Sequence, residues 1–330
     1  MVRLEFAGET NVGMKRTHNE DSFAVFAEEN LLIVADGMGG HASGEVASKM
    51  AVDAMKDFFV STAQDPERTW PYKMDRSRGD EENRLITGIK LANLRIYESA
   101  QRDVRQRGMG TTIVVLFAVE DGVYCAHVGD SRGYRIRDGK IEQLTEDHSL
   151  LNDYIKMKRL TPEEIANFPH KNVIVRALGM KDTVKVDTRF EPSRADDIYV
   201  LCSDGLSGPV SDEELLEIVQ GAPDLKAAAS RLIQRANENG ARLHSHVAEH
   251  PGERDAVRAE LGGDDVDVLA RWGFMGNNVL LAHGVQLTDA QAKMLARKGT
   301  RIVHCPSANL KLGSGIARVA DLDALGVQLA

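Results

Sequence analysis

Acidic side chains at the ends of apolar runs are the feature of this sequence with the clearest chemical meaning. Asp36 follows the apolar run 31–35, and Asp204 comes just after the run 198–202; each is followed by glycine. Glu20 lies in a polar loop before the first run. Oxygen-only ligand sets of this kind select Mg²⁺ or Mn²⁺ over zinc. Two such ions sharing one carboxylate can ionise a bridging water that attacks phosphate esters.

A basic side chain suited to phosphate accompanies the first acids. Arg16 precedes Glu20 by four residues, and Asp21 follows directly. A guanidinium fork near bound cations grips a phosphate group well. Gly37 exposes a carbonyl that no side chain shields, so it can serve as a further ligand. Asp-Gly pairs at strand ends are also common turns, so spacing alone leaves a purely structural explanation open.

The composition indicates a soluble globular protein. Of 330 residues, 42% are hydrophobic and 28% charged, and the net charge of −9 argues against nucleic-acid or anionic-membrane partners. The N-terminus lacks a signal-peptide pattern, and no apolar run approaches the roughly 18 residues of a membrane span. The three cysteines form no C-x-x-C pair, which favours inert thiols. We therefore expect a cytoplasmic protein, and a monomer.

Hydrophobic periodicity predicts a scaffold that changes character near Gly240. Residues 4–26 predict a short strand, a polar loop and a second strand. The following patterns predict helices at 44–59 and around 85–96, an antiparallel meander of strands at 111–118, 123–128 and 133–137, a flap within 144–170, and helices at 212–220 and 224–239. Beyond Gly240, strands at 278–283 and 301–305 alternate with helices at 288–298 and 321–325, which indicates parallel βαβ units.

Seven motifs add a family resemblance. They are RTHNEDS at 16–22, VADGMGGHASGE at 34–45, GMGTT at 108–112, HVGDSR at 127–132, LTEDHS at 144–149, VRALG at 175–179 and LCSDGL at 201–206. In this order they resemble the bacterial branch of the metal-dependent (PPM-type, type 2C) serine/threonine protein phosphatases. The resemblance covers 8–240 and implies an α+β fold, an αββα sandwich with two Mn²⁺ or Mg²⁺ ions between its sheets.

The resemblance also implies roles for single residues. Asp36 would bridge both metals, Glu20 and the Gly37 carbonyl would hold one, Asp204 the other, and Asp130 with Asp204 a weaker third; Asp21 would orient bound waters and Arg16 would bind the phosphate. His41 and the pair Thr111–Thr112 are interpreted as structural. The implied substrates are phosphorylated proteins made by a serine/threonine kinase, which would place the enzyme in signal transduction.

The resemblance ends abruptly near residue 242. Family members continue with a Gly-x-Arg-Asp-Asn-Ile-Thr-Val strand whose Asp is another metal ligand, whereas this chain reads Leu-His-Ser-His at 243–246. His244 and His246 fall near the position of the missing Asp, but imidazole is a poor ligand for Mg²⁺. We therefore expect a phosphatase domain at 1–242 that lacks its last strand, and a different segment at 243–330.

The segment 243–330 resembles the amidohydrolase superfamily, in its deaminase and chlorohydrolase branch. His246 would match a zinc ligand, Glu249 the general acid/base and His283 a polarising group. The first-strand His-x-His pair and last-strand Asp are absent, and about 90 residues cannot close an eight-stranded barrel. A natural fusion, a recombination product and an artificial chimera would read alike.

Three functions compete at this level. The first is a Mn²⁺- or Mg²⁺-dependent phosphatase acting on phosphoserine and phosphothreonine. The second is a catalytically impaired phosphatase-like module that binds phosphoproteins, motivated by the missing Asp. The third is a zinc amidohydrolase, which lacks most of its ligands.

Overall fold

The chain divides into two compact units, Met1–Asn237 and Glu238–Ala330, and each is described by itself. The computed structural model describes residues 4–13, 17–39, 43–65, 70–158, 160–161, 164–165, 168, 173–240, 243–249 and 251–329. Arg16, His41 and part of the expected flap lie outside these residues. Among the described helices, none combines the length and the apolar character needed to cross a membrane.

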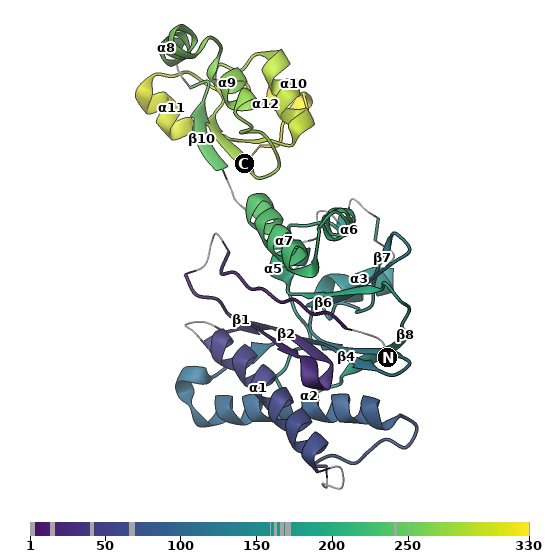
Figure 1. Ribbon diagram of the computed structural model, residues 1–330. Helices are drawn as coiled ribbons and strands as arrows, with labels where there is room; N and C mark the ends of the chain where they lie inside the picture. The colour runs from purple at the N-terminus through teal and green to yellow at the C-terminus, as the bar shows by residue number, and fades with distance from the viewer. Residues whose placement is uncertain are drawn as a thin grey trace. The chain divides into compact units, whose positions relative to one another are not determined.

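Two antiparallel sheets form the centre of unit 1 (Figure 1). The larger sheet has the order β1-β2-β4-β5-β8, with β3 paired to β2, and the smaller has the order β7-β6-β9. The strands are β1 Asp21–Phe26, β2 Leu31–Met38, β3 Gly110–Thr111, β4 Ile113–Val119, β5 Gly122–Val128, β6 Arg132–Arg137, β7 Lys140–Gln143, β8 Asp187–Pro192 and β9 Ile198–Cys202.

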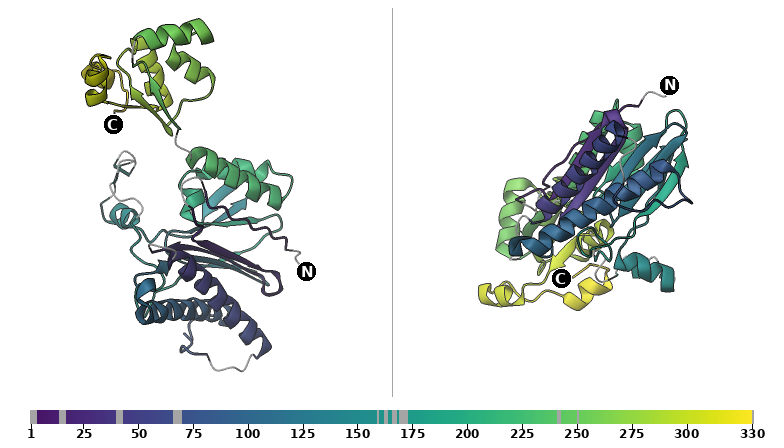
Figure 2. Two further views of the ribbon diagram at one scale, coloured as in Figure 1. Left: turned by 90° about the vertical axis from the view of Figure 1, so that its left-hand side faces the viewer. Right: turned by 90° about the horizontal axis from the view of Figure 1, so that it is seen from below.

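Helices cover the outer face of each sheet. The helices α1 Ser43–Gln64 and α2 Asp80–Arg102 lie side by side against the larger sheet (Figure 2). The smaller sheet packs against α6 Asp212–Gln220 and α7 Leu225–Gly240, while α3 Leu150–Lys158 and α5 Asp204–Ser207 lie in connections. A third apolar cluster lies between the sheets. The expected αββα sandwich is confirmed.

Local patterns explain the long helices. Leu85, Ile89, Ala92 and Ile96, which the sequence places on one face of α2, are all fully buried against α1 and the larger sheet. The predicted helix at 44–59 forms and continues to Gln64. A capping box between Ser211 and Glu214 starts α6 at its expected boundary.

Two expectations about unit 1 need correction. The meander is split, because Gly129 (φ 113°) turns the chain so that β6 joins the second sheet with β7 and β9. The first strand expected within 4–26 does not form: residues 4–12 carry no regular structure. A strand needs a hydrogen-bonding neighbour, and the described residues provide none for this segment.

Unit 2 has a parallel sheet with the order β10-β11-β12. Its elements are β10 Leu243–Val247, α8 Pro251–Leu261, α9 Asp265–Arg271, β11 Val279–His283, α10 Asp289–Lys298, β12 Arg301–Val303, α11 Pro306–Leu312 and α12 Val319–Ala324. The predicted alternation of strand and helix is confirmed. The described residues of this unit form three strands, so they make a β/α fragment and not a closed barrel.

Candidate metal centre

The backbone of Asp36, near the end of β2, is held in place by hydrogen bonds to two threonines. Its N–H donates to Oγ1 of Thr112 (3.0 Å), and its carbonyl accepts from the N–H of Thr112 (2.9 Å) and from Oγ1 of Thr111 (2.9 Å). The pair interpreted as structural therefore fixes the backbone from which the Asp36 carboxylate projects. These bonds connect segments about 75 residues apart, so spacing in the sequence could not reveal them.

Three carboxylates converge at this point. Asp21 of β1 is the direct partner of Asp36 across the ladder, and Asp204 begins α5 immediately after β9. Burial, followed by the charges of Asp21 and Asp204, raises the pKa of Asp36 to about 9. The pKa of Asp130 is raised to about 6, first by burial and then by Asp204. Buried acids that repel one another in this way fit a site that holds divalent cations.

Two glycines let Glu20 approach the same centre. The N–H of Gly37 donates to the carbonyl of Glu20 (3.1 Å), and a Cβ at Gly37 would lie 2.0 Å from the carbonyl oxygen of Gly44. A Cβ at Gly44 would lie 2.6 Å from Oε1 of Glu20. Only glycine fits at either position, which explains why the turn after Asp36 is rich in glycine.

One cavity of unit 1 brings most of the predicted ligands together. The predicted ligands Glu20, Asp36 and Asp204 line it together with Asp21, whereas Gly37 and Asp130 are not among its lining residues. Oγ of Ser203 donates to Oδ2 of Asp21 (2.9 Å), a contact that the sequence motif contains but does not reveal. All these ligand atoms are oxygens, which suit Mn²⁺ or Mg²⁺. The residues present thus fit the expected ions.

Comparisons with known proteins agree with this geometry. The model of the protein phosphatase 2C family matches residues 13–248. The chain belongs to this family. A serine/threonine phosphatase of Listeria monocytogenes is 37% identical over 238 residues, which cover 70% of this chain and 89% of that protein. The expectation of a metal-dependent serine/threonine phosphatase is confirmed at the level of the family.

Solved structures of phosphatases resemble unit 1 as well. The structure of the Mycobacterium tuberculosis phosphatase PstP matches with a TM-score of 0.60 and 37% identity, covering 69% of this chain and 89% of that one. A second structure, of the PstP catalytic domain, contains two manganese ions and matches with a TM-score of 0.56 and 37% identity over the same shares. A metal-dependent enzyme is therefore supported by relatives as well as by the acids of this chain.

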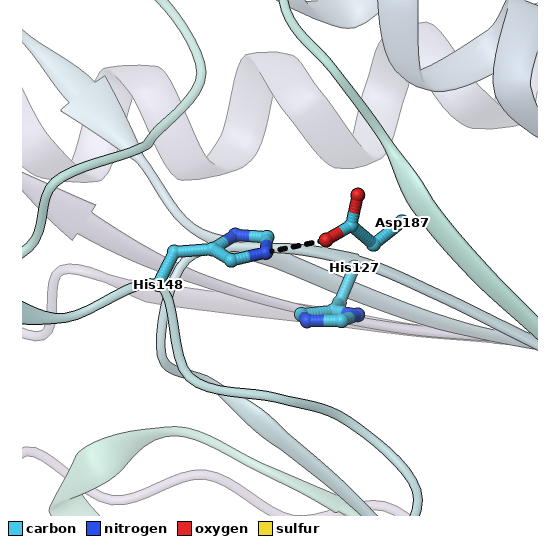
Figure 3. A group of neighbouring side chains, drawn as sticks. All are labelled: His127, His148 and Asp187. Atoms are coloured by element: carbon cyan, nitrogen blue, oxygen red, sulfur yellow. Dashed lines mark hydrogen bonds and ion pairs between the residues drawn. The ribbon is translucent and has the colours of Figure 1, made fainter. Parts of the chain in front are cut away.

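A histidine pair beside the phosphatase centre was not predicted (Figure 3). His127 and His148 stack with ring centroids 4.7 Å apart, and both lie near Asp187. Nδ1 of His148 accepts from the N–H of Gly129 (3.0 Å), so Nε2–H donates to Asp187 (3.0 Å). Arg176 lies 3.1 Å from the same carboxylate and supplies its positive charge.

These contacts give the histidine pair a structural role. Burial, the largest cause, lowers the pKa of His148 to about 4, so the ring is neutral and uses both of its nitrogens within the protein. The N–H of His148 also donates to the carbonyl of Gly129 (2.9 Å). His148 therefore clamps the backbone directly before Asp130, and the motifs HVGDSR and LTEDHS supply the two sides of this clamp.

The residues of the expected zinc site come together in unit 2. The amidohydrolase family model matches 208–330. Nε2 of His283 lies 2.9 Å from Nδ1 of His246 and 3.4 Å from Oε2 of Glu249. Nδ1 of His283 lies 2.6 Å from Oδ1 of Asn309, which makes it the protonated nitrogen and leaves Nε2 with its lone pair. The geometry thus brings these three side chains together.

Proposed function

We propose that unit 1 hydrolyses phosphoserine and phosphothreonine in proteins with the help of Mn²⁺ or Mg²⁺. The observation that carries this proposal is the convergence of Asp36 with Asp21 and Asp204 at a buried position. Burial first, and then the charges of these two acids, raise the pKa of Asp36 to about 9. A cation removes the repulsion and the proton together, because a ligand carboxylate must be ionised. The cluster thus has the electrostatic character of a metal centre.

The proposed ligands follow from their places in the fold. Asp36 would contact two ions, with Glu20 and the Gly37 carbonyl on one side and Asp204 on the other; Asp130 would add a weaker third site. When bound, the ions supply an ionised water and neutralise charge on the phosphate. Asp21, held by Ser203, would orient water, and Arg16, outside the described residues, would hold the phosphate.

The proposed domains are 1–242 and 243–330. We expect the change of sequence at their boundary to reduce the activity of the phosphatase domain. The stretch directly after α7, residues 241–254, contains no Asp, and Leu243–Val247 forms β10, which pairs with β11 of unit 2. Losing one carboxylate should weaken the binding of one metal. A chimera with reduced turnover is therefore our proposal for the whole chain, and a phosphoprotein-binding module without turnover is the alternative.

The deciding experiment is hydrolysis of p-nitrophenyl phosphate by the full chain with and without Mn²⁺. We expect Mn²⁺-dependent turnover that Asp36→Asn reduces at least about a hundredfold, as loss of a central catalytic group does. Asp53→Asn, at an exposed acid paired with Lys49 on α1, is the matched control and should retain activity. Folded protein that binds a phosphopeptide in millimolar Mn²⁺ but shows no turnover would establish the alternative.

We propose phosphorylated substrates of a serine/threonine kinase, in the cytoplasm, and a monomeric enzyme without a nucleic-acid or membrane partner. The net charge of −9 supports the expected lack of nucleic-acid and membrane partners. The cysteines at positions 125 and 202, which are free and buried, support the cytoplasm. Buried, unpaired thiols are usual in a reducing compartment.

A zinc amidohydrolase remains the second candidate, because His246, Glu249 and His283 lie within ligand distance of one another. The supporting detail is that Oε1 of Glu249 is buried without a hydrogen-bond partner. A three-ligand site with an open position suits zinc.

A further inference from the structure

A cavity of about 380 Å³ separates β9 from the N-terminal segment of unit 1. We call it the β9 slot. The larger sheet and α7 form its other walls, and its acidic end is the metal centre. Its lining residues are 5–13, 18–25, 32–34, 36, 198–206, 219, 225, 228, 229, 232, 233, 236 and 237.

Backbone without a sheet partner borders the slot on two sides. Within the part of the chain that the structure describes, β9 Ile198–Cys202 pairs with β6 along one edge, and no strand is paired along the other. Across the slot, residues 6–12 belong to no strand, although their sequence predicts one. Both stretches therefore offer N–H and C=O groups to a strand placed between them.

The other walls of the slot are apolar and incompletely covered. Phe23 is paired with Val34 across the β1–β2 ladder, so both side chains point to the inner face of the sheet. Val34 packs against the opposite sheet, but Phe23 is 38% exposed. Val12 is 41% exposed, and Ala229 and Ile233 of α7 are only half-buried. Sandwich interiors are normally close-packed, so a layer of side chains is missing here.

We propose that the β9 slot binds an extended peptide from another polypeptide, which adds a strand beside β9. Open backbone on two sides selects a strand over a compact small molecule, because only a strand satisfies both edges. Branched side chains should be favoured on both faces of the added strand, since one alternate set faces α7 and the other faces Phe23 and Val34. A match to β9 needs five residues, about 17 Å.

The segment that follows α7 in this chain does not form the strand beside β9. Residues 243–247 form β10, whose described ladder is parallel to β11. A strand added by another polypeptide would extend the sheet β7-β6-β9. It would also change how firmly the acidic residues at the end of the slot are held, and so regulate the metal centre. Only that regulatory consequence rests on the proposed phosphatase function; binding of the strand does not.

The test uses the full chain in EDTA and a labelled peptide containing Arg-Asp-Asn-Ile-Thr-Val. We expect saturable one-to-one binding by fluorescence anisotropy, with slowed amide exchange in Ile198–Cys202. Replacing Ile by Pro in the peptide should weaken binding about tenfold or more, because a ladder donor is lost. This arm needs no variant of the protein.

Variants of the protein locate the binding site. Ala229→Arg, in the wall of the slot, should weaken binding about tenfold, whereas Ala227→Arg, on the same helix but outside the lining, should not. Absence of binding, equal binding of the Pro peptide, or protection confined to other strands would overturn the proposal. So would protection of β9 that grows with protein concentration alone, because the occupant would then be a second copy. Since turnover is never measured, a failure of the proposed phosphatase activity cannot be confused with these results.

Discussion

Asp21 and Asp36 stand directly opposite each other on neighbouring antiparallel strands. Directly paired carboxylates repel, and burial makes the repulsion costly. The result is a pKa of about 9 for Asp36, with burial as the first cause and the Asp21 charge as the second. A sheet would gain stability from almost any uncharged pair here, so the two acids are explained best by the cations that they could hold.

The first prediction concerns stability and metal. Mn²⁺ at about 100 times its Kd should stabilise unit 1 by about 2.7 kcal/mol, which corresponds to a Tm increase of about 5–10 °C. Asp36→Asn should abolish the increase without lowering the Tm of the metal-free protein, because the amide removes a charge that metal-free folding opposes. Calorimetry in EDTA and in Mn²⁺ measures both quantities. An equal Mn²⁺ effect in the variant would contradict the assignment of Asp36.

A second prediction concerns the backbone clamp on Asp36. Thr112→Val removes the acceptor for the Asp36 N–H and the partner of the Ser131 hydroxyl, at a cost of about 1–3 kcal/mol. We also expect kcat to fall, because the backbone of Asp36 is no longer held in place and its carboxylate is positioned less precisely. Thr62→Val removes another buried hydroxyl, in α1 and distant from the centre, and should destabilise the protein without changing kcat. Similar kcat losses in both variants would show that stability alone was affected.

The sequence predicts the features that depend on local pattern. It does not predict the features that depend on contacts between distant segments of the chain. The buried face of α2 and the turn at Asp36–Gly37 follow from periodicity and from glycine chemistry. The clamp by Thr112 and the contact between Ser203 and Asp21 arise only when distant segments meet. The strand expected within residues 4–26 has the right pattern, but a strand is stable only beside another strand. Among the described residues, the segment 4–12 has no strand beside it, so its pattern alone does not make it a strand.

A third prediction tests the histidine cluster of unit 2. In the Asp36→Asn background we expect one equivalent of zinc per chain, measured by competition with a chromophoric chelator. His283→Ala should reduce the affinity by at least about tenfold, since it removes a ligand whose tautomer Asn309 fixes. His18→Ala, outside the cluster, is the control. If His283→Ala binds zinc as well as the control does, the zinc amidohydrolase is eliminated.

The fourth prediction is a pH dependence set by His148. Its pKa is lowered from 6.5 to about 4 in the folded protein, chiefly by burial, so the unfolded chain binds its proton more readily. The resulting stability is present above pH 6.5 and is lost as pH falls from 6.5 through 4, by up to about 3 kcal/mol. Asp187, with its pKa lowered to about 2, acts in the same direction at still lower pH.

Urea unfolding between pH 4 and 7 measures this dependence. His148→Gln should flatten the curve across that range and lower stability at pH 7, because the amide cannot reproduce both ring contacts. A wild-type curve that is flat from pH 7 to pH 4 would contradict a neutral, buried His148.

The last prediction separates the stabilities of the two units. Arg254 of α8 is 6% exposed and bonds to Asp264, to Gln291 of α10 (3.0 Å) and to the carbonyl of Gln286. Arg254→Met leaves these acceptors without their shared donor and should cost about 3–5 kcal/mol. Arg258→Met breaks contacts to the same Asp264 from a side chain that is 51% exposed, and should destabilise unit 2 much less than Arg254→Met does.

Because all these contacts lie within Glu238–Ala330, unfolding of Arg254→Met should show a lowered transition for unit 2 and an unchanged one for unit 1. Mn²⁺-dependent turnover should also persist in the variant at temperatures where unit 2 has unfolded. Limited proteolysis followed by a phosphatase assay gives an independent measurement, since cleavage should begin in 251–271, where α8 and α9 depend on Arg254. A single transition shifted as a whole would instead show that the two units fold as one cooperative body.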